Sequence, residues 1–79
     1  MDPRLMGMYK HYSGAMYEVV GLVYDARDTK KLVLYRSTSD AKIRETGESI
    51  PAGTHWVRPW SEFFDEHTPG VKRFAKIAP

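Results

Sequence analysis

The first third of the chain carries two β-favouring runs joined by a short polar turn. Residues 8–12 read Met-Tyr-Lys-His-Tyr, residues 13–15 read Ser-Gly-Ala, and residues 16–24 are apolar on both alternating faces except at Glu18. Two such runs around a short segment containing glycine are typical of a β-hairpin. The second strand is expected to be buried on both sides for much of its length. Gly21, in its middle, predicts a bulge or a sharp bend.

The middle of the chain loses this pattern. Residues 25–30 form a polar turn, and residues 31–36 predict a third strand around Leu-Val-Leu-Tyr. Residues 37–54 then hold only four apolar side chains in 18 positions. A connection of this length is usually functional or mobile, and we expect this one to be mobile. It has two possible local structures: one helical turn capped by Asp40, or a short hairpin turned at Gly47.

Order returns with a short strand and a group of aromatic residues. Residues 55–58 predict a strand that Pro59 ends. Residues 60–64, Trp-Ser-Glu-Phe-Phe, place aromatic rings at spacings i, i+3 and i+4, which is typical of one face of a helix. Ser61 is positioned to cap this helix. We therefore expect one or two helical turns that lay an aromatic face on the sheet and end at residues 68–70, Thr-Pro-Gly.

A last strand at residues 71–77 completes the expected fold. Five strands and one short helix with local connections are the outline of a small antiparallel barrel. We expect residues 1–79 to form a single domain that is mainly β. Its architecture should be a small antiparallel SH3-like barrel of about five strands with one short helix. An OB-like fold or an open, curved sheet is the alternative.

Composition limits the class of protein more than its function. The chain has 79 residues and no cysteine, which excludes disulfides and thiolate zinc sites. Its longest apolar run, residues 19–24, is far shorter than the roughly 18 residues of a membrane span. Residues 1–6 contain an early acid and no apolar segment, which argues against a signal peptide. We expect a cytoplasmic domain that does not contact a membrane.

Four blocks of residues are similar to one known family. They read Gly7-x-Tyr9-x-His11-Tyr12-x-Gly14-x-x-Tyr17-x-Val19, Val33-x-Tyr35, Trp56-x-Arg58-Pro59-x-x-x-Phe63 and Arg73-Phe74. In this order they resemble the bacterial family catalogued as domain of unknown function 1653, from Gly7 to Phe74. That family has no established activity, so the resemblance implies none. The chain departs from it in the connection before Trp56, which is short in the family and 18 residues long here.

Few residues are arranged for catalysis. His11, His55 and His67 contain no closely spaced pair of metal ligands, and the chain has neither a nucleophile elbow nor a phosphate-binding loop. We therefore expect no metal and no cofactor, and a protein that is not an enzyme. Two minor alternatives remain: a metal site built from His11, His55 and an acid, and a small hydrolase-like activity with one of these histidines as the base.

The candidate binding residues combine arginine with aromatic side chains. Residues two apart on a strand share a face, so Trp56 lies beside Arg58, and Tyr9 beside His11. An arginine next to an aromatic ring can stack on it and still bind a phosphate or carboxylate. Together with two further arginines that could supply charge, the candidate ligand-binding face comprises Tyr9, His11, Arg36, Trp56, Arg58 and Arg73.

This face favours a non-catalytic binding or accessory module. Tyr, His, Trp and Arg on one sheet surface are typical of sites for nucleic-acid bases, peptides or small anions. Residues 71–79 add three basic side chains and no acid, whereas residues 40–70 hold three basic and six acidic ones. Nucleic acid ranks first as partner, and a protein or peptide ranks second. The structural alternative is that Arg58 pairs with Glu18 or Glu62 and holds the helix to the sheet.

Overall fold

The structure is a computed structural model that describes residues 2–78. In chain order its elements are η1 (Pro3–Leu5), β1 (Gly7–His11), β2 (Met16–Tyr24), β3 (Lys31–Ser37), β4 (Ala41–Lys42), β5 (Ser49–Ile50), β6 (His55–Pro59), η2 (Trp60–Glu62), β7 (Glu66–Thr68), β8 (Val71–Lys72) and β9 (Phe74–Ala78). Within the described residues the helical elements are the two 3₁₀ turns, η1 and η2. Neither has the length or the apolar character to cross a membrane.

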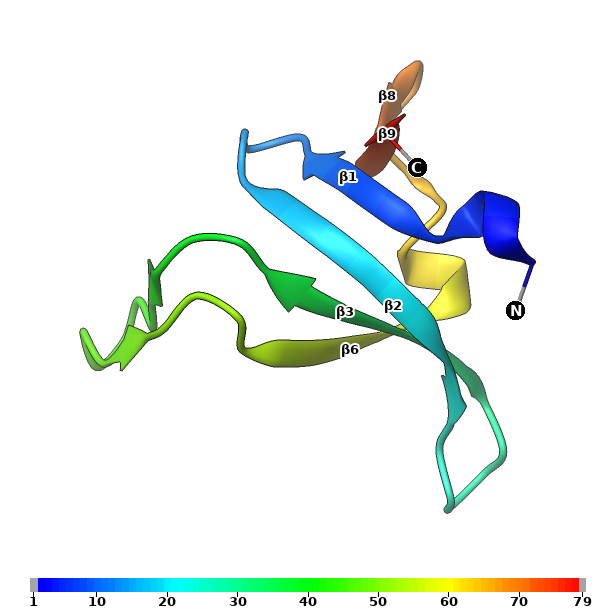
Figure 1. The fold of residues 1–79 in the computed structure, drawn as a ribbon, viewed down its shortest axis with the longest axis horizontal. Coiled ribbons are helices and arrows are strands. Elements are labelled where there is room, and N and C mark those ends of the chain that lie inside the picture. Colours follow the sequence, from blue (N-terminus) through cyan, green and yellow to red (C-terminus); the bar gives the residue numbers. More distant parts are fainter. Residues whose placement is uncertain (1, 79) are drawn as a thin grey trace.

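Five strands form one antiparallel sheet in the order β6-β3-β2-β1-β9 (Figure 1). The mainly β, antiparallel character expected from the sequence is therefore confirmed. No ladder joins the edge strands β6 and β9 within residues 2–78, so the closed SH3-like barrel is not confirmed. The pairing is that of an open sheet. Two further hairpins, β4–β5 and β7–β8, extend from it.

The β1–β2 hairpin and the bulge at Gly21 are confirmed. The register of β2 against β3 slips between Val19 and Gly21, so Val19 lies opposite Tyr35 and Leu22 lies opposite Val33. The bulge thereby turns Val19 and Leu22, three residues apart, to the same face of the sheet. Strand β2 is less buried than its apolar run predicted: Val19 is buried, and most of the rest is half-buried. The reason is that the structure covers only one face of the sheet.

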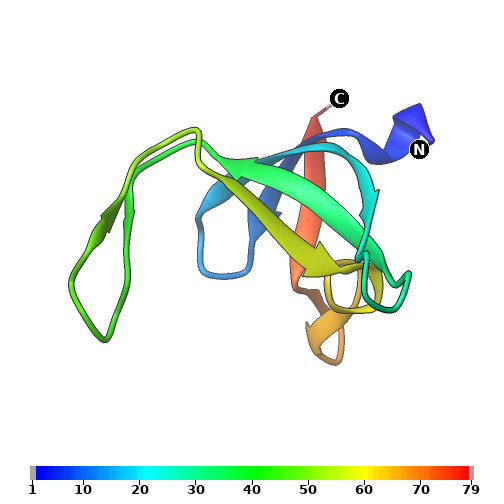
Figure 2. The same ribbon diagram turned by 90° about the horizontal axis from the view of Figure 1, so that it is seen from below.

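Residues 38–54 form an arm that projects away from the sheet (Figures 1 and 2). Strands β4 and β5 pair within it, and the turn between them contains Gly47 with a φ of 72°. Such positive φ values are easily adopted by glycine, which explains a hairpin at this position rather than the alternative helical turn. The Asp40 carboxylate accepts a hydrogen bond from the Ala52 amide at 2.8 Å and closes the base of the arm. Its mobility stays a prediction.

Three expectations for the C-terminal third are wrong. The helical segment does not extend to residues 68–70: η2 ends at Glu62, and Glu66–Thr68 forms strand β7 instead. Ser61 does not cap the aromatic turn: η2 begins after Pro59 without a side-chain cap, because Ser61 lies inside the turn. The expected strand at residues 71–77 is two elements. Val71 and Lys72 belong to the β7–β8 hairpin, whose turn contains Gly70 at a φ of 83°, and β9 begins only after Arg73.

The core lies on the face of the sheet that η2 covers, here called the inner face. Its buried members are Tyr9, Val19, Val33, Tyr35, Phe63 and Phe74. Phe63, which directly follows η2, is completely buried and stacks on Phe74 of β9, with ring centroids 4.1 Å apart. The i, i+3, i+4 aromatic spacing therefore delivers Phe63 onto the sheet as predicted. The short turn η2 and Phe63 thus cover part of the inner face, and other side chains cover the remainder.

Candidate binding site on the inner face

Arg58 occupies the inner face at the edge of the sheet. On β6 it lies opposite Val33, a buried residue of the inner face, and its side chain is half-buried. Its guanidinium carbon is 5.6 Å from the ring centroid of Phe74. Because Phe74 belongs to the other edge strand, β9, this cation–π contact spans the seam between the two unpaired edges of the sheet.

The guanidinium of Arg58 has no carboxylate partner. Glu18, one of the acids expected to pair with it, forms its salt bridge with Arg36 instead. Glu62, the other, is exposed, and none of the salt bridges within residues 2–78 involves Arg58. The structure therefore does not show the ionic brace between sheet and helix. The half-buried charge of Arg58 therefore has no direct ion pair; its acidic neighbour is Asp65, which is bound to Arg73 and whose pKa Arg58 lowers slightly.

Aromatic rings surround this charge. The ring centroid of Tyr17 lies 5.3 Å from that of Tyr35 and 5.8 Å from that of Phe74, and the His11 ring lies 4.9 Å from Phe74. Trp56 pairs in register with Tyr35 and packs against the core. The neighbourhood of Arg58 is therefore rich in aromatic rings, of which Phe74 contacts the guanidinium and His11 and Tyr17 are close enough to feel its charge. Sequence reasoning missed Tyr17, although the period of two from the apolar Val19 could have placed it on this face.

Three buried polar atoms in this region have no hydrogen-bond partner among the described residues. They are Trp56 Nε1, Arg58 Nε and Ser37 Oγ. All three belong to the neighbouring strands β3 and β6. An unsatisfied buried donor costs about 1–3 kcal/mol, so native proteins keep few of them. These atoms are shielded from solvent, so a ligand could reach them only after their side chains move; the group that the inner face presents is the half-buried guanidinium of Arg58, which suits a ligand with hydrogen-bond acceptors.

His11 contributes a neutral ring to the site. The Ser13 amide donates to His11 Nδ1 at 3.2 Å, and the Ser13 hydroxyl lies 2.8 Å from the same nitrogen. Burial lowers the pKa of His11 below its usual value of 6.5, and the positive charges of Arg58 and Arg73 and the proximity of His67 lower it further. With Nδ1 accepting from the amide, the proton of the neutral ring lies on Nε2, which is left as a donor.

The other predicted binding residues are engaged in contacts of their own. Tyr9 is buried in the core, and its hydroxyl donates to the Leu5 carbonyl at 2.8 Å. Arg73 pairs with Asp65 at 2.9 Å, an interaction that lowers the pKa of the Asp65 carboxyl. Arg36 lies on the opposite, outer face with its partner Glu18. Of the six predicted residues, the structure therefore brings together His11, Trp56 and Arg58.

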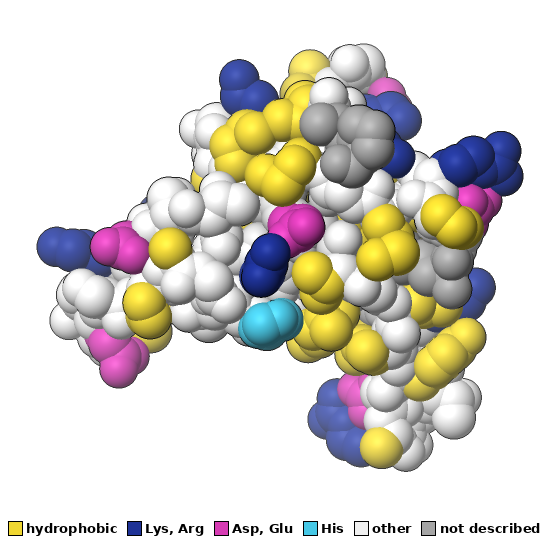
Figure 3. Space-filling model, in the orientation of Figure 1, with side chains coloured by type: hydrophobic (Ala, Val, Ile, Leu, Met, Phe, Trp, Pro, Cys, Tyr) yellow, Lys and Arg dark blue, Asp and Glu magenta, His cyan; other side chains and the backbone are white. Residues whose placement is uncertain are grey.

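The outer face carries a different set of side chains. The register places Glu18, Arg36 and His55 in one row across β2, β3 and β6. In Figure 3 an acidic, a basic and a histidine side chain follow one another across these strands. His55 and His11, the two histidines considered as bases, therefore lie on opposite faces. In the part of the chain that the structure describes, no group of three or more His, Cys, Asp or Glu side chains could hold a metal ion.

Comparison with known proteins identifies the family. No curated protein and no solved structure matches the chain. One family model matches residues 7–76, nearly the whole chain; the match includes β1, β2, β3, β6, the first part of β9 and the residues around Arg58. The chain belongs to the family described as "Protein of unknown function (DUF1653)".

Proposed function

We propose that the chain is a non-catalytic binding module whose inner face binds single-stranded nucleic acid at Arg58. The observation that carries this proposal is the guanidinium of Arg58, which has no carboxylate partner and lies among aromatic rings. Proteins that bind single strands combine positive charge with aromatic stacking surfaces. Arginine serves both purposes, because its planar group stacks on rings and donates to phosphate or base oxygens.

The unpartnered donors support the same ligand class. Nucleobases and phosphates present many acceptors, which suit the Arg58 guanidinium and the Nε2 proton of His11. Trp56 Nε1 and Arg58 Nε are buried and would gain a partner only if their side chains move when the ligand binds. A base that enters beside Tyr17 would gain stacking area, and its phosphate would meet the guanidinium. Each such contact contributes on the order of 1–3 kcal/mol of binding free energy. The binding surface is small, so we expect weak, salt-dependent affinity.

A protein or peptide partner is the second candidate. It is favoured by apolar side chains on the outer face, where Leu34 and Val57 are cross-strand neighbours and Val57 is 55% exposed. Yellow hydrophobic areas are visible over this face in Figure 3. An exposed apolar patch of this kind is common at protein interfaces. It lies on the side of the sheet opposite Arg58, so the two candidates use different surfaces.

The test is a chemical-shift titration of the labelled protein with a short oligothymidylate, at low and at physiological salt. We expect the Trp56 indole and the amides of Tyr17 and Arg58 to shift together, with affinity falling as salt rises. Arg58→Met should weaken binding roughly 5- to 100-fold, as the loss of one such contact predicts. Arg36→Met is the matched control, since it removes the same charge from the outer face and should change affinity little.

Two results would overturn the proposal. One is a titration in which no inner-face resonance moves at low salt. The other is an Arg58→Met protein that binds the oligonucleotide as tightly as the wild type. Shifts that Arg36→Met abolishes and Arg58→Met preserves would place the nucleic acid on the outer face instead.

A further inference from the structure

A second cationic depression lies away from Arg58, between η1, β8 and β9. Its volume is about 190 Å³. Its apolar lining includes the rings of Phe64 and Phe74, and its cationic lining consists of Arg4, Lys72 and Lys76. These three cations come from three separate segments of the chain, and no Asp or Glu lines the depression. The fold therefore brings together three cationic side chains that are far apart in the sequence.

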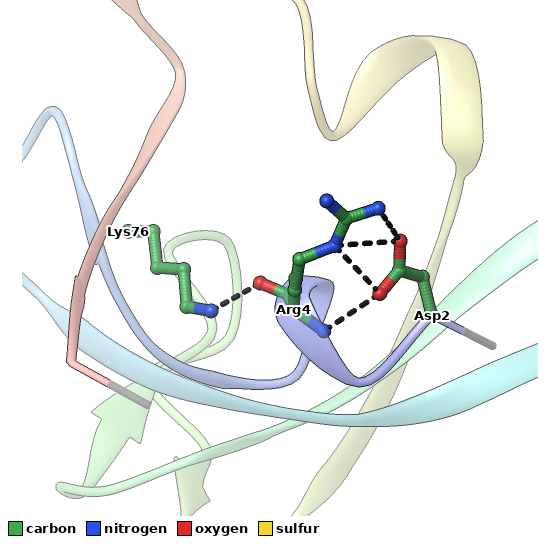
Figure 4. A network of polar contacts seen from close by, with 3 residues as sticks. All are labelled: Asp2, Arg4 and Lys76. Carbon is green, nitrogen blue, oxygen red and sulfur yellow. Dashed lines mark hydrogen bonds and ion pairs between the residues drawn. The ribbon is translucent and has the colours of Figure 1, made fainter.

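Hydrogen bonds hold part of this wall in place. The Lys76 ammonium donates to the Arg4 carbonyl, which joins β9 to the N-terminal turn (Figure 4). The Arg4 guanidinium in turn binds the Asp2 carboxylate through Nε and Nη2, at 3.1 and 2.8 Å to Oδ2. This pairing with Arg4 is the main reason why the pKa of Asp2 is lowered, and Lys76 adds a smaller contribution. Asp2 therefore offsets one of the three positive charges.

No ion pair within residues 2–78 offsets the charges of the two lysines, Lys72 and Lys76. Glu66 lies opposite Lys72 in the β7–β8 ladder, but its carboxylate accepts a hydrogen bond from the Gly70 amide at 3.1 Å. After Asp2 is counted against Arg4, the lining has an excess of two positive charges beside an aromatic surface.

We propose that this depression binds a phosphate group of an organic molecule. Two ammonium groups match the charge of a phosphate monoester, and lysine binds phosphate as a point charge without demanding a fixed geometry. The volume exceeds that of one phosphate, so the depression also accommodates part of the group that carries it, against Phe64 and Phe74. The phosphate belongs either to a free phosphorylated small molecule or to the backbone of a nucleic acid.

This site is separate from the one at Arg58. Arg58 does not line the depression, and Phe74 is the one residue of the inner-face site that does. The two proposals can therefore fail independently. The first concerns the donors and rings around Arg58, and the second concerns the two lysines.

The experiment is a chemical-shift titration of the whole chain with inorganic phosphate, in which sodium chloride keeps the ionic strength constant. We expect the amides of Phe64, Lys72 and Lys76 to move together and to saturate. Lys72→Gln and Lys76→Gln should each weaken phosphate binding roughly tenfold, the effect of one charged hydrogen bond. Lys42→Gln, on the projecting arm, is the matched control and should bind phosphate as the wild type does.

Further titrations with other compounds identify the source of the phosphate. Adenosine monophosphate should move the same amides at lower concentration than inorganic phosphate, and adenosine should move them less. An oligothymidylate without a terminal phosphate should move them only if the site takes backbone phosphates. Either source supports the proposal.

The proposal is overturned if phosphate moves none of these amides, or if Lys72→Gln binds it as tightly as the wild type. The Lys72 side chain forms no salt bridge within residues 2–78 and is exposed, so Lys72→Gln should leave the fold intact and decides the question even if Lys76→Gln is unstable. The proposal also fails if Arg58→Met abolishes phosphate binding while Lys72→Gln preserves it, because the anion then binds at Arg58.

Discussion

Replacing Arg58 with methionine should make the protein more stable. The change removes a half-buried charge that has no carboxylate partner and a buried Nε that makes no hydrogen bond. Methionine replaces the aliphatic part of the arginine side chain with an unbranched, flexible chain that ends near the position of Nε, so the aliphatic packing at the seam is kept. The perturbation therefore separates the electrostatic cost of Arg58 from the packing of its aliphatic part.

The expected magnitude follows from three contributions. Removal of the unsatisfied Nε raises the free energy of unfolding by about 1–3 kcal/mol. Loss of the cation–π contact with Phe74, 5.6 Å from the guanidinium, removes about 0.5–1 kcal/mol at a partly exposed site. A sulfur–aromatic contact with the same ring restores about 0.3–1.5 kcal/mol. We expect a net gain of about 1–2 kcal/mol in the free energy of unfolding. In a domain of this size that raises Tm by roughly 4–16 °C.

The assay is urea denaturation followed by circular dichroism, with Arg36→Met measured in parallel. That control removes an exposed ion pair with Glu18 on the outer face, so its free energy of unfolding should change by less than about 1 kcal/mol. If Arg58→Met is instead destabilised by more than about 1 kcal/mol, Arg58 contributes to folding, and the reasoning from its missing partners is wrong. The combination of higher stability and lost oligonucleotide binding would show that Arg58 is kept for the ligand.

Four further predictions concern the rest of the fold. Phe63→Ala should lower the free energy of unfolding by about 3–5 kcal/mol, since Phe63 is completely buried. Tyr24→Ala, at a side chain that is 59% exposed, should change it by less than about 0.5 kcal/mol, and equal effects in urea denaturation would contradict this core. Thr29 has a φ of 57°, so Thr29→Gly should raise Tm; a lower Tm would show that the turn is unstrained. Burial and nearby charges lower the pKa of His11, so the unfolded chain binds the extra proton first. Stability should therefore fall as the pH drops below about 6.5, and less so in His11→Asn; parallel denaturation curves for the two proteins would refute this. Amides of residues 38–54 should exchange faster with deuterium than those of β2, and equal protection would show that the arm is rigid.

The parts of the fold that were predictable depend on local pattern. Alternation around a glycine-containing turn indicates the β1–β2 hairpin, and a lone glycine in an apolar run indicates the bulge at Gly21. The aromatic spacing predicts that Phe63 faces the core. Barrel closure is different in kind. It depends on whether two distant edge strands pair, and hydrophobic periodicity carries no information about that contact.

Only part of the candidate site could be predicted from the sequence. The period of two correctly relates Trp56 to Arg58 on one strand. Which acid reaches Arg58 depends on how faces of different strands are matched, and that is decided by register. The observed register pairs Glu18 with Arg36 on the outer face and leaves Arg58 without either expected partner. The sequence alone does not show this strand register, so it could not show which acid would pair with Arg58.

The unclosed sheet and the candidate site are two aspects of one feature. In a closed barrel, β6 and β9 would satisfy each other's backbone groups through a ladder, and the seam between them would be filled. Here side chains bridge that seam instead: Arg58 reaches from one edge to Phe74 on the other. A side-chain bridge of this kind leaves the backbone groups along the two edges unpaired with each other, which a ladder would not do. For the proposed binding role, the consequence is that a ligand with a flat ring and acceptors would enter at the seam that no ladder closes within residues 2–78, beside Arg58 and Phe74.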